Sequence, residues 1–284
     1  MSTATQALPA RPAAARLVTA ARSHPFAAIG FTILAAYLML GLIGPFLVTD
    51  PLATDPAHTL AGPSATHWFG TDTYGRDVFA RAVYASRLDV VLGLSISTSA
   101  MVVGSAIGVL AGFFGGRIDE IVMRCVDIVL AFPGFILAMI LVVAIGESVP
   151  KVALAVAIAF VPQFVRLTRA SVLSERELEY VDGARLAGNG PWRIAFRHVW
   201  PNATRPALVQ LTLVSGFSIL NIAGLAFLGV GIRPPTAEWG VMVAEGAANT
   251  ITGQWWTALF PGAMIVGIVM ALHFIGDEFE RGRP

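Results

Sequence analysis

Long runs of apolar residues, without the alternation typical of half-buried strands, occur six times along this chain. A helix needs about 20 apolar residues to cross the hydrocarbon core of a bilayer. Transmembrane strands alternate between lipid-facing and inward-facing residues over about ten positions, and these runs do not alternate. The pattern therefore predicts six transmembrane helices, over residues 26–48, 90–114, 121–146, 151–170, 206–232 and 257–276.

The first and fourth runs need separate comment. The first is longer than the 7–15 apolar residues of a secretory signal peptide, so we expect a retained membrane anchor. The fourth has an uncharged part of only 152–165, which as a helix reaches about 21 Å. It spans a bilayer only if Lys151 at one end, and Arg166 and Arg169 at the other, extend toward the membrane surface.

The composition agrees with a membrane protein and excludes other classes. Hydrophobic residues make up 56% and charged residues 13% of the chain, whereas soluble domains carry about 25% charge. A water-soluble enzyme and a disordered chain are both excluded by this balance. The net charge of +1 leaves no basic surface for nucleic acid. Cys125 is the single cysteine, so neither an internal disulfide nor a thiolate metal cluster is possible.

The distribution of basic residues predicts the orientation. With the N-terminus in the cytoplasm, 14 of the 19 lysines and arginines fall on the cytoplasmic side. The positive-inside rule then places both termini there. Residues 1–25 become a cytoplasmic tail and residues 171–205 the only long cytoplasmic loop. Residues 49–89 and 233–256 become outer loops.

The cytoplasmic loop predicts two short helices separated by a turn. Ser174 and Glu177 have the spacing of a capping box, and Gly188–Pro191 interrupts the helix that follows. The second helix carries an apolar stripe at helical spacing, formed by Trp192, Ala195, Phe196 and Val199. Two interpretations are open: a helix that lies on lipid headgroups, or a docking surface for a soluble partner.

Several sequence blocks resemble one family of proteins. Residues 182–184, 188 and 198–201 resemble the E-A-A-x3-G-x9-I-x-L-P loop of ABC importer permeases, although Asp182, Gly183, His198 and Trp200 replace the usual residues. The block 67–77 is similar to H-x-x-G-T-D-x-x-G-R-D, 127–133 to D-x-x-L-A-F-P, and 231–240 to G-x-x-P-P-x-P-E-W-G with Ala237 for the last proline. Together with Gly276-Asp277 they resemble the C-type permeases of dipeptide, oligopeptide and nickel importers over about 24–280.

The resemblance implies a fold and a set of partners. The fold is all-α, the six-helix type I ABC importer permease fold with a cytoplasmic coupling helix, in the bacterial inner membrane. The implied partners are a second permease, two cytoplasmic subunits that bind ATP and Mg²⁺, and an extracytoplasmic binding protein. Dipeptides or oligopeptides are the implied substrates, with nickel, glutathione or another small solute as alternatives.

The resemblance also implies site residues. Contact with the ATP-binding subunit would involve Asp182, Gly183, Ala184, Gly188, Trp192, Ile194, Phe196 and Pro201. The outer-loop signature consists of Gly70, Thr71, Asp72, Gly75, Arg76 and Asp77.

Other activities are disfavoured by the residues themselves. A P-loop needs a lysine in G-x4-G-K-[ST], and the single lysine, Lys151, lies outside any such motif. ATP hydrolysis is therefore expected from partner subunits, and we expect no catalytic, cofactor or metal site in this chain.

An ion-coupled secondary transporter is a weaker alternative, because the first, second and fifth spans hold no ionisable residue. Asp127 is expected to pair with Arg124. An intramembrane enzyme is weaker still, since the histidines are scattered and neither H-E-x-x-H nor G-x-S-x-G occurs.

Some polar and small residues admit two interpretations. A helix that starts at Asp77 would pair it with Arg81 and turn Val78, Ala82 and Ala85 toward the membrane, as a lid, a binding-protein contact or a simple cap. His67 and Asp72 are expected to structure the loop rather than bind a metal. Three residues of the fifth span are candidates to line the pathway or to join helices: Thr212, Ser215 and Asn221. Three glycines of the second span would pack against another helix, within this chain or across a permease–permease interface: Gly104, Gly108 and Gly112.

Overall fold

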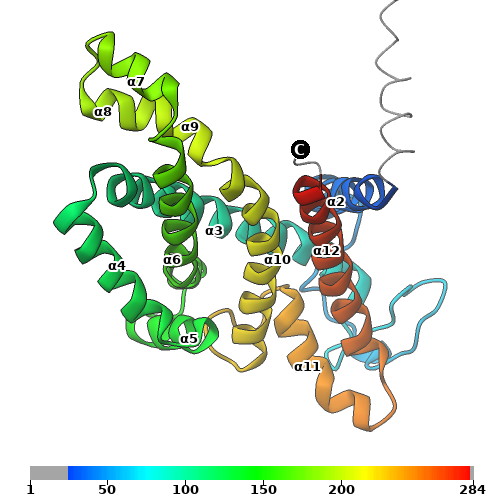
Figure 1. The fold of residues 1–284 in the computed structure, drawn as a ribbon. Helices are drawn as coiled ribbons and strands as arrows, with labels where there is room; N and C mark the ends of the chain where they lie inside the picture. The colour runs from blue at the N-terminus through cyan, green and yellow to red at the C-terminus, as the bar shows by residue number, and fades with distance from the viewer. Residues whose placement is uncertain (1–24, 282–284) are drawn as a thin grey trace, which may run out of the picture.

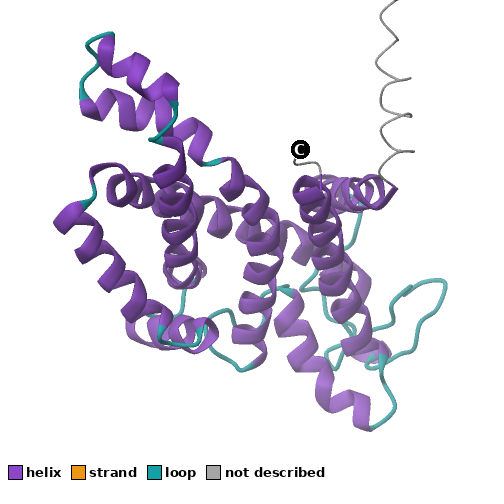
Figure 2. Ribbon diagram, in the orientation of Figure 1, coloured by secondary structure: helices purple, strands orange, loops and turns teal. Residues whose placement is uncertain are grey.

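The computed structural model describes residues 25–281, so the tail expected at 1–25 lies outside the described residues except for Pro25. Within this range the chain is helical and forms no strand, apart from an isolated bridge between Thr71 and Asp77 (Figure 2). The long helices are α2 (Pro25–Ile43), α3 (Val78–Phe114), α4 (Gly116–Leu130), α5 (Gly134–Ile145), α6 (Val149–Glu175), α10 (Arg205–Phe227), α11 (Trp239–Ile251) and α12 (Trp256–Arg281). The short ones are η1 (Gly44–Phe46), η2 (Pro56–His58), α7 (Glu179–Leu186), α8 (Pro191–Arg193), η3 (Ile194–Val199) and α9 (Trp200–Ala203).

The helices form three apolar cores, and α3 contributes to each. The first lies among α3, α5, α6 and α10, and the second joins α2, α11 and α12 to the first part of α3. The third joins the last part of α3 and α6 to the short helices α7, η3 and α9. Helices α7 and α8 project from one end of the molecule, whereas α11 and the loop before α3 lie at the opposite end (Figure 1). The predicted cytoplasmic loop and the two predicted outer loops are therefore at opposite ends, as six spans require.

Five helices are long and apolar enough to cross a membrane, and a bent pair brings the number to six within residues 25–281. The bent pair replaces the continuous span predicted over 121–146. Helices α4 and α5 meet at an angle of 91° across the break at 131–133. Pro133 causes this break, because it has no amide hydrogen to donate and it disfavours helical geometry at Phe132.

Helix α3 begins well before the apolar run that predicted it. It starts at Val78 and has 37 residues, so it is about 55 Å long. The Asp77 carboxylate caps it by accepting from the Ala80 amide at 2.8 Å. The expectation that Val78, Ala82 and Ala85 face the membrane is wrong: all three are buried in the core that contains α11 and α12.

Charged residues of the fourth predicted span form ion pairs with α4. Arg166 contacts Asp127 at 2.7 Å, and Arg169 contacts Asp119 with Nη2 at 2.6 Å from Oδ2. The predicted Arg124–Asp127 pair is therefore wrong. Helix α6 has 27 residues, or about 40 Å, so it is not limited to the short uncharged stretch. Arg166 and Arg169 therefore join α6 to α4. The sequence predicted only that they extend toward the membrane surface.

The small-residue ladder of α3 packs against α6. A Cβ at Gly104 would lie 2.6 Å from the Phe164 Cβ, and one at Gly108 would lie 2.7 Å from the Val165 carbonyl oxygen. A Cβ at Gly112 would lie 3.0 Å from the Arg169 carbonyl oxygen. Only glycine permits so close a helix approach, which confirms the interpretation as packing within this chain.

Candidate functional site

The segment between α6 and α10 folds as a small helical lobe, which we define as residues 176–204. It contains α7, α8, η3 and α9. The capping box predicted at Ser174 and Glu177 is wrong, because α6 continues through Ser174 and ends at Glu175. Helix α7 begins at Glu179. The first short helix therefore starts later than predicted. The lobe follows directly after the end of α6.

Gly188 ends α7 in a left-handed conformation, with φ of +78°. Its amide donates to the Arg185 carbonyl at 3.0 Å, and the Asn189 amide donates to the Ala184 carbonyl at 3.2 Å. This pair of hydrogen bonds is the Schellman arrangement, in which a residue of positive φ reverses the chain after a helix. Gly188 thus sets the angle between α7 and the helices that follow.

Apolar residues on the inner faces of the lobe attach it to the bundle. Val181 and Ala184 from α7 meet Ile194, Ala195 and Val199 from η3. The same core contains Val109 of α3 and Val172 of α6. Ile194 is only 2% exposed, so it supports the lobe from inside and presents no surface of its own.

An aromatic ladder connects the lobe to α3. Trp192 lies 4.8 Å from Phe114 and is stacked parallel to Phe196 at 5.9 Å between ring centroids. Phe196 meets Trp200 edge-on at 5.3 Å, and the Trp200 indole donates to the Ser105 hydroxyl at 3.2 Å. The rings therefore form a continuous packed connection between the lobe and α3.

The outward surface of the lobe mixes exposed apolar and charged residues. Leu186 is 90% and Trp192 61% exposed. Asp182 pairs with Arg185 on its own helix at 2.7 Å, and a Cβ at Gly183 would meet nothing within 4 Å. Sequence reasoning did not single out Leu186. The helical spacing of α7 places this residue on the face opposite the buried residues, and that spacing could have identified it. Pro201 is exposed at the start of α9.

At the other end of the molecule, Asp72 organises a tight turn. One oxygen, Oδ1, accepts from the amides of Tyr74 at 2.8 Å and Arg76 at 3.0 Å. The other, Oδ2, accepts from the Arg76 Nε at 2.6 Å. Gly75 has φ of +72°, and a side chain there would collide with the Asp55 backbone. The G-T-D-x-x-G-R-D block is thus a single folded unit.

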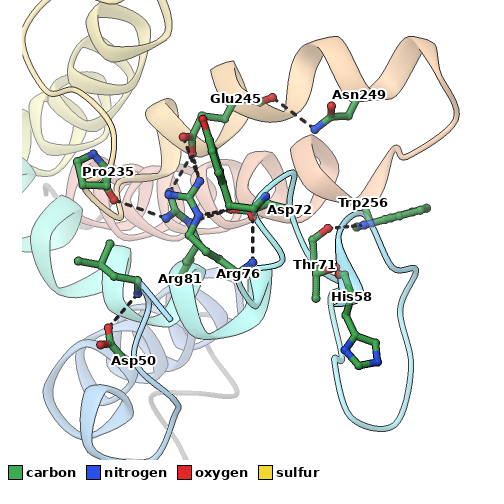
Figure 3. A network of polar contacts seen from close by, with 12 residues as sticks. Asp50, His58, Thr71, Asp72, Arg76, Arg81, Pro235, Glu245, Asn249 and Trp256 are labelled. Atoms are coloured by element: carbon green, nitrogen blue, oxygen red, sulfur yellow. Dashed lines mark hydrogen bonds and ion pairs between the residues drawn. The ribbon is translucent and has the colours of Figure 1, made fainter. Parts of the chain in front are cut away.

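Two arginines and two acids form what we call the outer-loop network: Asp72, Arg76, Arg81 and Glu245 (Figure 3). Both Glu245 oxygens accept from the Arg76 Nη2 at 3.1 Å, and Oε2 also accepts from the Arg81 Nη2 at 2.9 Å. Arg81 is also 3.7 Å from Asp72. The predicted Asp77–Arg81 pair is wrong. The arginine side chains are only 5% and 1% exposed, so the two acids balance positive charges that are almost fully buried.

Glu245 is a second residue that sequence reasoning missed. Its partners lie 164 and 169 residues away, so no local spacing relates them. The available signal was its position as the only charged residue in 239–256. Its carboxylate fastens α11 to the loop before α3.

The remaining signature residues close the same loop. The Trp256 indole donates to the Thr71 carbonyl at 3.2 Å, and His67 Nδ1 lies 2.8 Å from Asp77 Oδ2. Gly70 has φ of +71°. The expected structural role of His67 is confirmed, although its partner is Asp77.

The three candidate pathway residues of α10 do not form one surface. Ser215 is 1% exposed and its hydroxyl lies 2.7 Å from that of Ser97 in α3. Thr212 donates to the Val209 carbonyl and Asn221 to the Phe217 carbonyl, both at 2.8 Å. Ser215 joins two helices, whereas Asn221 is half-buried and bonds only within its own helix.

A bundle of helices long and apolar enough to cross a membrane, with a helical lobe at one end and a structured loop at the other, defines a multi-pass membrane protein. The family model described as binding-protein-dependent transport system inner membrane component matches residues 104–282. The chain belongs to this family.

Curated relatives cover most of the chain. A dipeptide transport system permease protein of Alkalihalophilus pseudofirmus is 39% identical over 90% of this chain and 84% of its own length. A probable D,D-dipeptide transport system permease protein of Escherichia coli is 39% identical over 93% and 88%. A glutathione transport system permease protein of Pectobacterium atrosepticum is 38% identical over 76% and 71%. The ion-coupled carrier alternative is not supported by these relatives.

Proposed function

We propose that this chain is one of two permease subunits of an ATP-driven importer that carries dipeptides or oligopeptides across the bacterial inner membrane. The peptide substrate is supported by the names of relatives that align over nearly the whole chain. A second permease would complete the pathway, two subunits would supply ATP hydrolysis, and a binding protein would deliver the peptide. Glutathione, itself a peptide, is the alternative that a relative favours.

The single observation that carries the mechanism is the aromatic ladder between the lobe and α3. Interface anchors are typically large side chains that are exposed before binding and buried afterwards. Leu186 and Trp192 satisfy the first condition, and Trp192 is also the first ring of the ladder. An ATP-binding subunit that binds these residues would therefore act on α3 through the contact between Trp192 and Phe114. Asp182 and Gly183 lie on the same outward surface and would contact the same partner.

The outer-loop network lies at the opposite end of the molecule from the lobe, and its role would be to shape the surface on which the binding protein docks. Its buried charges hold the loop before α3 rigidly against α11. A rigid surface is what a docking binding protein requires, because ordering a mobile loop on contact would reduce affinity. Gly70, Thr71, Asp72, Gly75, Arg76 and Asp77 are therefore assigned to the shape of this surface.

We expect ATP hydrolysis to depend on partner subunits. The purified chain should hydrolyse no ATP, while the complex with its second permease and ATP-binding subunits, in liposomes, should do so and respond to loaded binding protein. The readouts are phosphate release and uptake of a labelled dipeptide, with unlabelled glutathione and nickel as competitors. Specific ATP turnover by the isolated chain, or uptake without ATP, would refute the proposal. Competition by glutathione alone would favour the alternative substrate.

The orientation is tested by labelling single cysteines from outside intact spheroplasts. In a Cys125→Ser background, cysteines at Thr66 and Ala248 should react with an impermeant reagent, because both positions are exposed and belong to the predicted outer loops. A cysteine at Ala187, exposed on the lobe, should react only after the membrane is opened. Reaction of Ala187→Cys in sealed cells would reverse the proposed orientation.

A further inference from the structure

Two acidic side chains that have no role in the lobe or the outer-loop network are buried together between α3 and α11. Asp89 in α3 is 2% exposed, and Glu238, which precedes α11, is 0% exposed. The Asp89 carboxylate accepts a hydrogen bond from the amide of Trp239, the residue after Glu238, so the two carboxyl groups are neighbours. An ionised carboxylate is costly in such surroundings unless it is paired with an opposite charge.

Backbone amides account for only half of the oxygens in this pair. Asp89 Oδ2 accepts from the Trp239 amide at 3.0 Å, and Glu238 Oε2 accepts from the Val241 amide at 2.6 Å. Asp89 Oδ1 and Glu238 Oε1 are buried and receive no hydrogen bond from any other N–H or O–H group. A proton between the two carboxyl groups would satisfy both.

Among residues 25–281, no basic side chain forms an ion pair with either acid. The nearest arginine along α3 that points into the protein, Arg81, is bound to Glu245 and Asp72. Arg87, also in α3, is exposed on the surface. From α2, Tyr37 contacts the Trp239 ring, and its hydroxyl donates to the Met264 carbonyl.

We propose that Asp89 and Glu238 form a proton-binding site, in which one carboxylic acid donates a hydrogen bond to the other carboxylate at neutral pH. Two like charges in contact cannot both ionise without a large cost, as in carboxylate pairs that share a proton. Burial also raises the pKa of the Glu238 carboxyl, and the nearby backbone amides of Val241 and Gly240 oppose this effect only in part.

The proton-bridged pair fastens the segment before α11 to α3. Trp239 follows Glu238 and is fully buried, and its indole donates to the Ala82 carbonyl at 3.0 Å. The backbone amide of Trp239 donates the hydrogen bond that Asp89 accepts. The E-W-G block thus closes the outer end of the bundle, and loss of the proton would place two negative charges at the point of attachment.

Infrared difference spectroscopy on the full chain in lipid nanodiscs tests the shared proton. Asp89→Asn/Glu238→Gln keeps the approximate shapes of the side chains but removes both carboxyls. The native-minus-variant spectrum at neutral pH should contain one protonated-carboxyl band and one carboxylate signal. Glu120→Gln, at an exposed position, should change only the carboxylate signal. Two carboxylate signals and no acid band, or two acid bands, would overturn the proposal.

The pH dependence of stability gives a second test that needs only a folded single variant. A proton retained in the folded state but released by the unfolded chain, whose acids have pKa values of about 4, makes stability fall as pH rises. For one such proton the unfolding equilibrium constant rises about tenfold per pH unit. Glu238→Gln carries a permanent donor, so its unfolding in detergent should be less pH-dependent than that of the native chain between about pH 6 and 9. Identical pH slopes for the two proteins would contradict the shared proton.

Discussion

Replacing Glu245 by alanine is expected to destabilise the outer end of the protein by about 3–5 kcal/mol, the usual effect of removing one member of a buried ion pair. The Arg81 side chain is 1% exposed, and Glu245 supplies its closest charged contact. Asp72 alone would then face two buried arginines, Arg76 and Arg81. Thermal unfolding of the purified chain in detergent measures the loss.

Two variants calibrate this effect. Glu245→Gln retains an oxygen acceptor but not the charge, and should lie between the native protein and the alanine variant. Glu177→Ala removes the acid of a pair with Arg176 that is 72% exposed on the glutamate side, and should change stability by less than about 1 kcal/mol. An alanine variant at position 245 as stable as Glu177→Ala would show that the network contributes little.

Gly188→Val is expected to abolish uptake while leaving the protein inserted in the membrane. A left-handed conformation costs a residue with a Cβ about 1–2 kcal/mol, and a β-branched side chain is among the least tolerant. Space is not the obstacle, since a Cβ at Gly188 would meet nothing within 4 Å. The strain acts on the φ of +78°, so the turn between α7 and α8 opens and the exposed residues of the lobe lose their relative positions.

The neighbouring glycine provides a matched control. Gly190 has φ of −67° and ψ of 155°, and no atom lies within 4 Å of a Cβ built there. This extended geometry suits a β-branched residue before proline, so Gly190→Val should transport nearly normally. Uptake of labelled dipeptide and co-purification of the ATP-binding subunit are the measurements. Normal values for both in Gly188→Val would remove the proposed coupling role of the turn.

Part of the site could be predicted because its geometry is local. The positive φ at Gly188 follows from a glycine between a helix and Asn189–Pro191, and the cap at Asp77 follows from an acid directly before an apolar helix. Partner assignments for charged residues failed where they assumed neighbours in sequence. Asp127 pairs with Arg166 instead of Arg124, and Arg81 pairs with Glu245 instead of Asp77.

The extent of the helices shows the same division. Apolar runs located the membrane-spanning segments, because a backbone in lipid must satisfy its own hydrogen bonds within a helix. The runs did not locate where α3 begins. Its first residues are apolar on one side only and are buried by α11 and α12. This burial depends on distant elements: Trp239 of α11 contacts the Ala82 carbonyl from 157 residues away.

The sequence by itself determined what rests on local backbone chemistry and on the solvent: the membrane spans, the turn at Gly188 and the family resemblance. Only the tertiary structure decided which charged groups meet, which face of the lobe is outward and how Trp192 reaches α3. Contacts between distant segments depend on the simultaneous packing of several helices. A buried charge forms an ion pair with whichever opposite charge the packing brings within about 3 Å. The spacing of residues along the chain therefore does not determine which ion pairs form.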